Sequence, residues 1–168
     1  PAAAEHYNIS PDIRDYVLHP TVVNISGLPN TNGDSFSAKE WLTFKPKFGM
    51  LAYKTFKAKS CYLEHSNQDY RKSAGVIFDS SLTRLVGFDG DRAKLMLLLA
   101  FDRTLHPELC EAILNGTHNT YSMGVYYTAY TCSICGNTFS GSSRSFCSHT
   151  RINKPVYRVG DKLAYRIC

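Results

Sequence analysis

The stretch that decides the fold is PELCEAILNGTHNTYSMGVYYTAYTCSICGNTFSGSSRSFCSH, residues 107–149. Its first nine residues predict a short helix, because Pro107 suits a first helical turn and Gly116 suits a stop. Residues 119–128 are rich in β-favouring side chains and predict a strand. Two pairs of metal-ligating residues follow: Cys132-x-x-Cys135 and Cys147-x-His149. A helix, a strand and a metal-ligand pattern are therefore expected within about one supersecondary unit.

The composition is that of a globular protein. The chain has 168 residues, 43% of them hydrophobic, and we expect one domain over residues 1–168. The longest apolar run, residues 95–101, is too short to cross a bilayer, and no secretory signal is visible at the start. The net charge of +5 is spread out, with one mild cluster in residues 45–59. We interpret that cluster as a solvated face in preference to a nucleic-acid footprint. An acidic protein partner is a further alternative.

The hydrophobic and turn patterns on either side of this stretch predict a mostly β (α+β) domain with a few short helices. The apolar run 94–101 favours a central strand buried on both faces, and the capping-box pattern Ser37-Ala-Lys-Glu40 favours a short helix. The segment Tyr16–Ile25 contains a proline and suits an edge strand at best. We expect a loose arm in 1–12, a loop in 27–33, strands in 57–64, 75–79 and 84–88, and two short strands in 155–167. Such strands predict a closed or partly closed barrel.

The cysteine pattern predicts a metal site rather than disulfides. Six cysteines, local Cys-x-x-Cys spacing and no visible signal favour a reducing compartment. Residues 130–151 form the predicted zinc-binding loop, in which four protein ligands leave no open position, so that the Zn²⁺ is structural. The alternatives are reduced thiols beside a surface histidine and, less favoured, a redox pair. The predicted ligands are Cys132, Cys135, Cys147 and His149. Cys61 and Cys110 are interpreted as small core residues.

A candidate nucleophile lies in the predicted strand 119–128. Ser122 is followed by Gly124, and a nucleophilic serine needs a base that takes its proton. Among the six histidines, His65 stands at the end of a predicted strand before a polar loop, which makes it the best-placed base. The residues alone leave the ordinary interpretation open, in which Ser122 is a strand serine and His65 a surface histidine.

The order of these residues resembles the prohead (procapsid) maturation serine proteases of large tailed bacteriophages, which are related in fold to the herpesvirus assemblins. The resemblance covers roughly residues 60–150. It is carried by an ordered set of motifs: His65-Ser-Asn67, Gly75-Val-Ile-Phe-Asp79, Ala100-Phe-Asp102-Arg103, Asn115-Gly116, Tyr121-Ser122-Met-Gly124, Cys132-Ser-Ile-Cys135-Gly and Cys147-Ser-His149.

The resemblance implies a herpesvirus-protease-like β-barrel with Ser122 as nucleophile and His65 as base. Asp102 is the first choice for the third catalytic residue and Asp79 the second. His149 would mimic the second histidine of the assemblins, but its place beside Cys147 favours the metal. A structural pairing of Asp102 with Arg103, or a helix cap, is the competing interpretation of that carboxylate.

The implied substrates are phage scaffold and capsid proteins and the precursor of the enzyme itself, cut inside the prohead in the cytoplasm of the bacterial host. No membrane and no specific nucleic acid is expected, and a homo-oligomer stays open because the herpesvirus relatives act as dimers. Two alternatives remain. One is a non-catalytic structural phage head or tail protein on the same fold. The other is a zinc-ribbon-like nucleic-acid module, disfavoured because only Arg144 and Arg151 lie near the predicted ligands in sequence.

Overall fold

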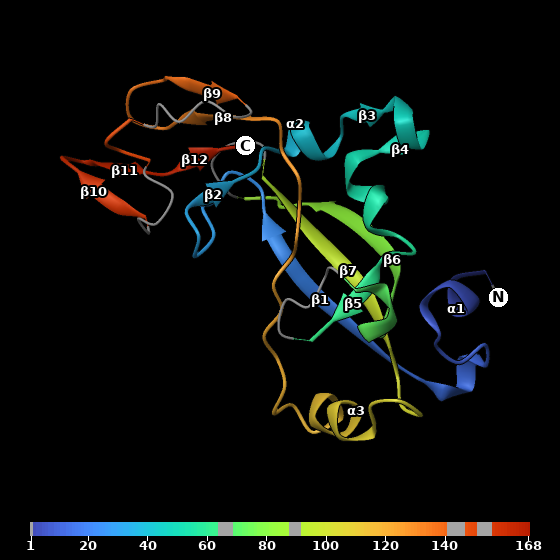
Figure 1. The fold of residues 1–168 in the computed structure, drawn as a ribbon. Helices are drawn as coiled ribbons and strands as arrows, with labels where there is room; N and C mark the ends of the chain where they lie inside the picture. The colour runs from blue at the N-terminus through green and yellow to red at the C-terminus, as the bar shows by residue number, and fades with distance from the viewer. Residues whose placement is uncertain (1, 64–68, 88–91, 141–146, 151–155) are drawn as a thin grey trace. The chain divides into compact units, whose positions relative to one another are not determined.

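The computed structural model describes residues 2–63, 69–87, 92–140, 147–150 and 156–168. The described chain is mostly β with few helices, as predicted (Figure 1). It divides into two compact units, and the chain passes between them several times. The first unit comprises residues 1–23, 44–83 and 95–122, and the second comprises 24–43, 84–94 and 123–168.

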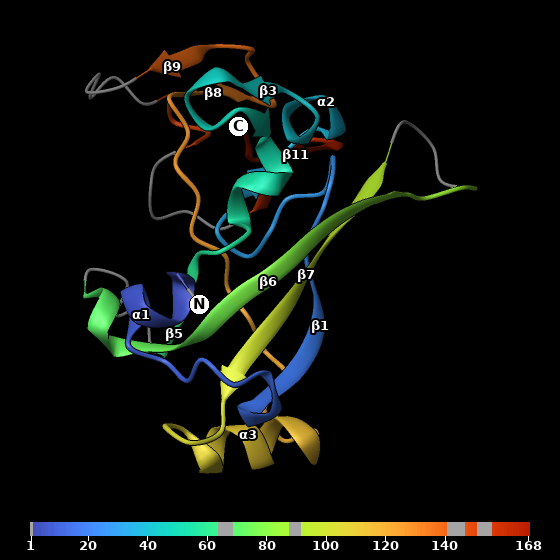
Figure 2. The ribbon, with the colours of Figure 1, turned by 90° about the vertical axis from the view of Figure 1, so that its right-hand side faces the viewer.

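A four-stranded sheet forms the centre of the first unit. Its order is β1 (Tyr16–Ile25), β7 (Ala93–Asp102), β6 (Ser73–Arg84) and β5 (Ser60–Tyr62) (Figure 2). The predicted central strand is confirmed as β7, which lies between β1 and β6. The predicted burial on both faces is not seen over its first six residues, because Leu95, Leu97 and Leu99 are buried while Lys94, Met96 and Leu98 are only half-buried. The predicted edge strand is confirmed as β1. An edge tolerates Pro20, because a strand with one neighbour can lack a backbone donor on its open side.

The sheet of the first unit is open, so the predicted barrel closure is not seen. β1 and β5 are its two edges and are hydrogen-bonded to β7 and β6, respectively, rather than to each other. The predicted strands 75–79 and 84–88 are replaced by β6, one continuous strand that ends at Arg84. The predicted strand 57–64 is reduced to β5, because a 3-10 helix, Ala52–Phe56, precedes it and Ala58 takes a positive φ of 60°.

Helices cover the ends of the first unit. The predicted helix over 107–115 is confirmed as α3 (Pro107–Leu114), with Gly116 at a φ of 79° after its end. The prediction of a loose N-terminal arm is wrong, because residues 2–7 form α1 (Ala2–Tyr7). The Tyr7 hydroxyl donates to the Ala58 carbonyl at 2.9 Å and Ile9 is buried, so the arm is fixed to the unit. Short 3-10 helices span Ile13–Asp15, Pro46–Phe48 and Tyr70–Lys72, and a hairpin joins β3 (Phe44–Lys45) to β4 (Met50–Leu51).

A second four-stranded sheet forms the second unit. Its order is β2 (Asp34–Ser35), β12 (Arg166–Ile167), β8 (Ala129–Cys132) and β9 (Thr138–Ser140). β12 runs parallel to β2 and antiparallel to β8. The capping-box helix is confirmed as α2 (Ala38–Trp41), where the Ser37 hydroxyl accepts from the Glu40 N–H. The two predicted C-terminal strands are β10 (Tyr157–Val159) and β11 (Lys162–Ala164).

The predicted strand over residues 119–128 is wrong, since residues 118–127 are neither helix nor strand. Two of their aromatic side chains pack against other rings instead of lining a ladder, whereas Tyr126 is fully exposed. Tyr121 contacts His19 and Phe101, whereas Tyr127 contacts Phe36 and Tyr130. Across the described ranges, no helix combines the length and the apolar composition that a membrane crossing requires.

Candidate metal centre and candidate catalytic residues

The first half of the candidate metal centre is a tight turn after β8. Cys132 is the last residue of β8, and the N–H of Ile134 points at its Sγ from 3.4 Å. Gly136 closes the turn through its N–H to the Cys132 carbonyl at 3.0 Å and takes a φ of 70°, which favours glycine. The turn therefore presents the thiols of Cys132 and Cys135 to one point, as the Cys-x-x-Cys spacing predicts.

The turn is fastened to the C-terminal strands through one serine. The Ser133 hydroxyl donates to the Leu163 carbonyl at 2.7 Å and accepts from the Tyr165 N–H at 2.9 Å. The Ser133 N–H also donates to the Tyr165 carbonyl at 3.1 Å. Sequence reasoning missed this role, because a serine between two cysteines gives no sign of a partner some thirty residues later.

The second half of the centre is a turn that begins at Cys147. The Thr150 N–H donates to the Cys147 carbonyl at 3.2 Å, and Thr150 itself is buried. The Cys147 Sγ lies 3.2 Å from the Thr150 hydroxyl oxygen. The Tyr157 hydroxyl donates to the Ser148 carbonyl, so β10 holds this turn. Cys147 and Ile134 pack against the buried cluster of Tyr130, Cys132 and Phe139.

The two turns bring all four predicted ligands together. One ligand atom from each of Cys132, Cys135, Cys147 and His149 lies within 4.8 Å of every other, so the group could hold a metal ion. The His149 Nδ1 is buried and has no hydrogen-bond partner in the described chain. A buried imidazole nitrogen without a partner is costly in a bare protein but is what a metal ligand needs. The residues therefore fit a bound metal.

The thiols of the centre have unequal proton affinities. Burial alone would raise the pKa of Cys147, but hydrogen bonds from Thr150, the His149 backbone N–H and the two neighbouring thiols lower it to about 6. Burial raises the pKa of Cys132. Because the thiolate is the metal-binding form, Cys147 is the thiol most ready to bind a cation near neutral pH.

The predicted nucleophile lies at the surface of the first unit. Ser122 is exposed, and its neighbour Tyr121 is held by rings on both sides. The Tyr121 ring lies 5.1 Å from that of His19 and 5.5 Å from that of His118. Burial and the nearby Cys61 thiol both raise the pKa of Tyr121. Sequence reasoning missed both contacts: His19 lies about a hundred residues away in sequence, and His118 is only three residues away but was not linked to Tyr121.

The predicted base, His65, lies outside the described residues. The described strand nearest to it in sequence is β5, which ends at Tyr62. Cys61, in the middle of that strand, is half-buried, and burial raises its pKa to about 12. Cys110 is buried, as predicted for a small core residue, whereas Cys61 is only partly so; neither belongs to the metal-ligand quartet.

Asp102, the first choice for a third catalytic residue, is fully buried and bound to backbone. One carboxylate oxygen accepts from the Ser10 N–H at 2.6 Å, and the other accepts from the Thr104 N–H and hydroxyl at 2.8 and 2.6 Å. Burial alone would raise the pKa of Asp102, but bonds from Thr104, Ser10 and Leu105 hold it below its ordinary value. This environment is that of a carboxylate which ties the N-terminal arm to the turn after β7.

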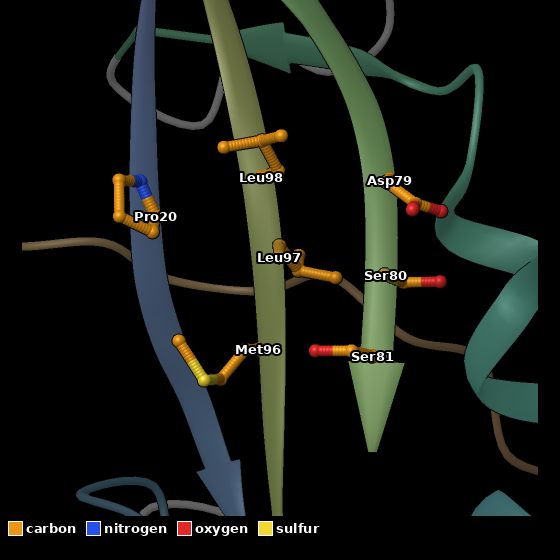
Figure 3. Close-up of a pocket in the computed structure, with 7 residues that line it drawn as sticks. All are labelled: Pro20, Asp79, Ser80, Ser81, Met96, Leu97 and Leu98. Atoms are coloured by element: carbon orange, nitrogen blue, oxygen red, sulfur yellow. The ribbon is translucent and has the colours of Figure 1, made fainter. Parts of the chain in front are cut away.

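Asp79, the second choice, is one of the residues that line a pocket on the sheet of the first unit. The pocket, of about 200 Å³, is lined by Pro20, Asp79, Ser80, Ser81, Met96, Leu97 and Leu98 (Figure 3). The carboxyl of Asp79 and the hydroxyl of Ser80 extend to the same side of β6 in that view. Asp79 is exposed and forms an ion pair with Lys57 at 3.8 Å, which is the ordinary role of a surface carboxylate.

Comparison with protein-family models, with curated proteins and with solved structures gave no match.

Proposed function

We propose that this chain is a serine endopeptidase of the prohead-maturation class, with Ser122 as nucleophile, His65 as base and a structural Zn²⁺ on its four Cys/His ligands. Its substrates are scaffold and capsid proteins and its own precursor. The ordered motifs that resemble these proteases are the starting point of the proposal. Its location is the interior of the phage prohead in the host cytoplasm.

One structural observation carries the catalytic part. Ser122 is exposed, and the residue before it, Tyr121, lies near Cys61, because burial and then the neighbouring Cys61 side chain raise the pKa of Tyr121. Cys61 belongs to β5, and His65 follows that strand by three residues. A serine nucleophile and a histidine base on different segments must come within reach of each other. The segment of Ser122 lies near β5, the strand that precedes His65 in sequence, which supports this pairing.

The proposed chemistry is acyl transfer. His65 takes the Ser122 proton as the hydroxyl oxygen attacks the scissile carbonyl carbon, and the same proton then passes to the leaving amine. Water hydrolyses the acyl-enzyme in a second, equivalent step. A backbone N–H that binds the oxyanion contributes roughly 3 kcal/mol to such a reaction.

The proposed catalytic core is the Ser122–His65 pair, and Asp102 acts as a structural anchor. Both oxygens of Asp102 accept hydrogen bonds from Ser10 and Thr104. A carboxylate whose two oxygens already accept these hydrogen bonds has little capacity left to orient an imidazole. The same bonds hold the turn between β7 and α3 in place. The Zn²⁺ of the proposal likewise has four protein ligands, so it supports the fold and takes no part in the reaction.

The test compares wild type with Ser122→Ala and His65→Ala on co-expressed scaffold and capsid proteins of the same phage. The matched control is Thr120→Ala, an exposed residue of the same segment. Circular dichroism and zinc content verify that each variant is folded. We expect wild type and Thr120→Ala to cut and the other two to be inactive, and diisopropyl fluorophosphate to modify wild type but not Ser122→Ala.

Cleavage by folded Ser122→Ala would remove Ser122 as the nucleophile. If the wild type neither cuts the scaffold and capsid proteins nor reacts with diisopropyl fluorophosphate, the alternative function is favoured, a non-catalytic structural phage head or tail protein.

A further inference from the structure

The feature that the protease proposal does not use is a basic hairpin segment, residues 44–59, in the first unit. It holds five lysines and no Asp, Glu or Arg. The formal net charge of the whole chain is +5, so the remaining basic and acidic residues balance. The segment thus carries basic residues without any acidic residue between them. Its lysines are Lys45, Lys47, Lys54, Lys57 and Lys59.

The segment is folded and anchored rather than loose. β3 and β4 pair with Lys45 opposite Met50, and a 3-10 helix with Gly49 at a φ of 64° closes the tip. At its other end Phe56 is buried, and Ala58 and Lys59 exchange backbone hydrogen bonds with Ile77 at 2.8 and 2.7 Å. An anchored hairpin presents its side chains in a fixed arrangement, which lowers the entropy cost of binding a partner.

Large apolar side chains are exposed on this anchored hairpin. Phe44 is 56% exposed, Phe48 49% and Met50 37%. Full burial of one such side chain contributes roughly 1.5–3 kcal/mol, and each of these half-buried side chains leaves only a part of that gain to a partner. Both faces of the hairpin thus expose an apolar side chain that a partner could cover, Phe44 on one and Met50 on the other.

The lysines are interleaved with these apolar groups. The Lys47 ammonium lies 5.8 Å from the centre of the Phe48 ring, and that of Lys54 lies 5.9 Å from the centre of the Tyr53 ring. Lys57 reaches Asp79 at 3.8 Å, and both partners are solvent-exposed. A partner that suits this surface must offer carboxylates and apolar side chains at the same time.

Two other classes of macromolecule fit this surface less well. Single-stranded nucleic acid needs open aromatic faces for its bases, whereas Lys47 already covers one face of Phe48. A membrane anchor needs an apolar face separated from a basic rim. Directly opposed residues of an antiparallel pair share a face, so Met50 shares one face of the hairpin with Lys45, whereas Phe44 lies on the other face opposite Leu51. The exposed apolar side chains therefore do not form a single apolar face.

We propose that the basic hairpin segment is a docking site for an acidic polypeptide segment of a partner protein, one that carries aliphatic or aromatic side chains between its carboxylates. Lysines pair with the carboxylates, and Phe44, Phe48 and Met50 cover the apolar side chains. This surface acts whether or not Ser122 is a nucleophile, because none of its residues belongs to the proposed catalytic pair.

Fluorescence anisotropy on the full chain tests the proposal. The probe is a labelled peptide in which Glu and Leu alternate, compared with polyglutamate of equal charge, oligothymidylate, and vesicles of phosphatidylcholine with phosphatidylserine. The variants are Phe44→Ser/Phe48→Ser and Lys47→Gln/Lys54→Gln, and the matched control is Lys162→Gln in β11. Thermal melts verify that the variants are folded.

We expect the Glu/Leu peptide to bind best, and either double variant to weaken it at least roughly tenfold, equal to about 1.4 kcal/mol. Lys162→Gln should bind as wild type does, and added salt should weaken the complex. Tighter binding of oligothymidylate or of the vesicles would overturn the proposal in favour of nucleic acid or membrane. Peptide binding that is unchanged in both double variants would place the contact elsewhere and overturn it too.

Discussion

The Arg166 guanidinium donates from Nε to the Asp34 Oδ1 at 2.5 Å and from Nη2 to the Asn32 carbonyl at 2.8 Å. The two side chains are only 11% and 13% exposed. They occupy opposed positions in the parallel pair of β12 and β2, and the guanidinium also lies 5.9 Å from the centre of the Tyr130 ring. One ion pair thus ties the last strand of the chain to the first strand of the second unit.

Arg166→Met is expected to destabilise the second unit by about 3 kcal/mol, because it leaves the Asp34 carboxylate buried without its partner. Urea denaturation followed by tryptophan fluorescence measures the loss, since Trp41 lies in this unit. The double variant Arg166→Met/Asp34→Leu removes both charges and should regain much of the stability. An unchanged urea midpoint for the single variant would show that the pair contributes nothing.

Gly75→Ala is expected to disrupt the pairing of β6 with β7. A Cβ built on Gly75 would lie 2.0 Å from the Ala100 carbonyl oxygen and 2.8 Å from the Phe101 Cα. These are backbone atoms, which cannot turn aside, so the cost should reach or exceed the roughly 1–3 kcal/mol typical of an overpacked core. The control is Gly87→Asn, at a position of open space and positive φ. Equal thermal melting of the two variants would contradict this close approach.

Local patterns were enough to predict several elements of this fold. The apolar run of β7, the capping box of Ser37 and the helix between Pro107 and Gly116 depend on neighbours in sequence, and all three are as predicted. The Cys-x-x-Cys turn is also local. The approach of the Cys147 turn to the Cys-x-x-Cys turn is not local, but it was predicted from chemistry, because two pairs of Cys and His side chains can bind one metal ion together.

The remaining features depend on contacts that sequence spacing does not reveal. Residues 118–127 have strand-favouring side chains, but the Tyr121 ring packs against His19 from β1 and against its own neighbour His118, and no strand forms. The surroundings of Asp102 include the Ser10 N–H, 92 residues away. A triad carboxylate and an anchoring carboxylate look alike in sequence, and only the partners of the oxygen atoms distinguish them.

Asp102→Asn is expected to lower the stability of the first unit and to reduce its sensitivity to acid. The hydrogen bonds of Asp102 hold its pKa below the ordinary value of about 3.9. Its contribution is therefore fully present above that value and is lost as the pH falls through the lower pKa of the folded state. The urea midpoint should fall less steeply in the variant than in wild type as the pH is lowered from neutral into the acidic range.

Asp161→Asn, at an exposed position, is the control for the loss of one charge and should leave the pH dependence of the urea midpoint as in wild type. Peptidase activity of Asp102→Asn, measured where the variant is fully folded, separates the two roles of the carboxylate. A triad member would lose activity by several orders of magnitude, whereas an anchor keeps most of it. The large loss would contradict the anchor role proposed here.

Cys135→Ser is expected to abolish metal binding and to unfold part of the second unit. Cys135 is the exposed member of the quartet, so its replacement leaves no cavity and tests ligation alone. The apparent binding free energy of structural Zn²⁺ is on the order of 10 kcal/mol, comparable to the net stability of a whole domain. Elemental analysis should give one zinc per wild-type chain and none in the variant, with a matching fall in melting temperature.

The matched control is Cys168→Ser, because Cys168 packs against the same buried cluster but lies outside the quartet. It should keep its zinc, and Co²⁺ in its site should show the same thiolate charge-transfer absorption as in wild type. Metal affinity should fall with falling pH, since protons compete for the thiolates. Zinc retained by Cys135→Ser, or lost by Cys168→Ser alone, would mean that the ligand set is not the one that the two turns bring together.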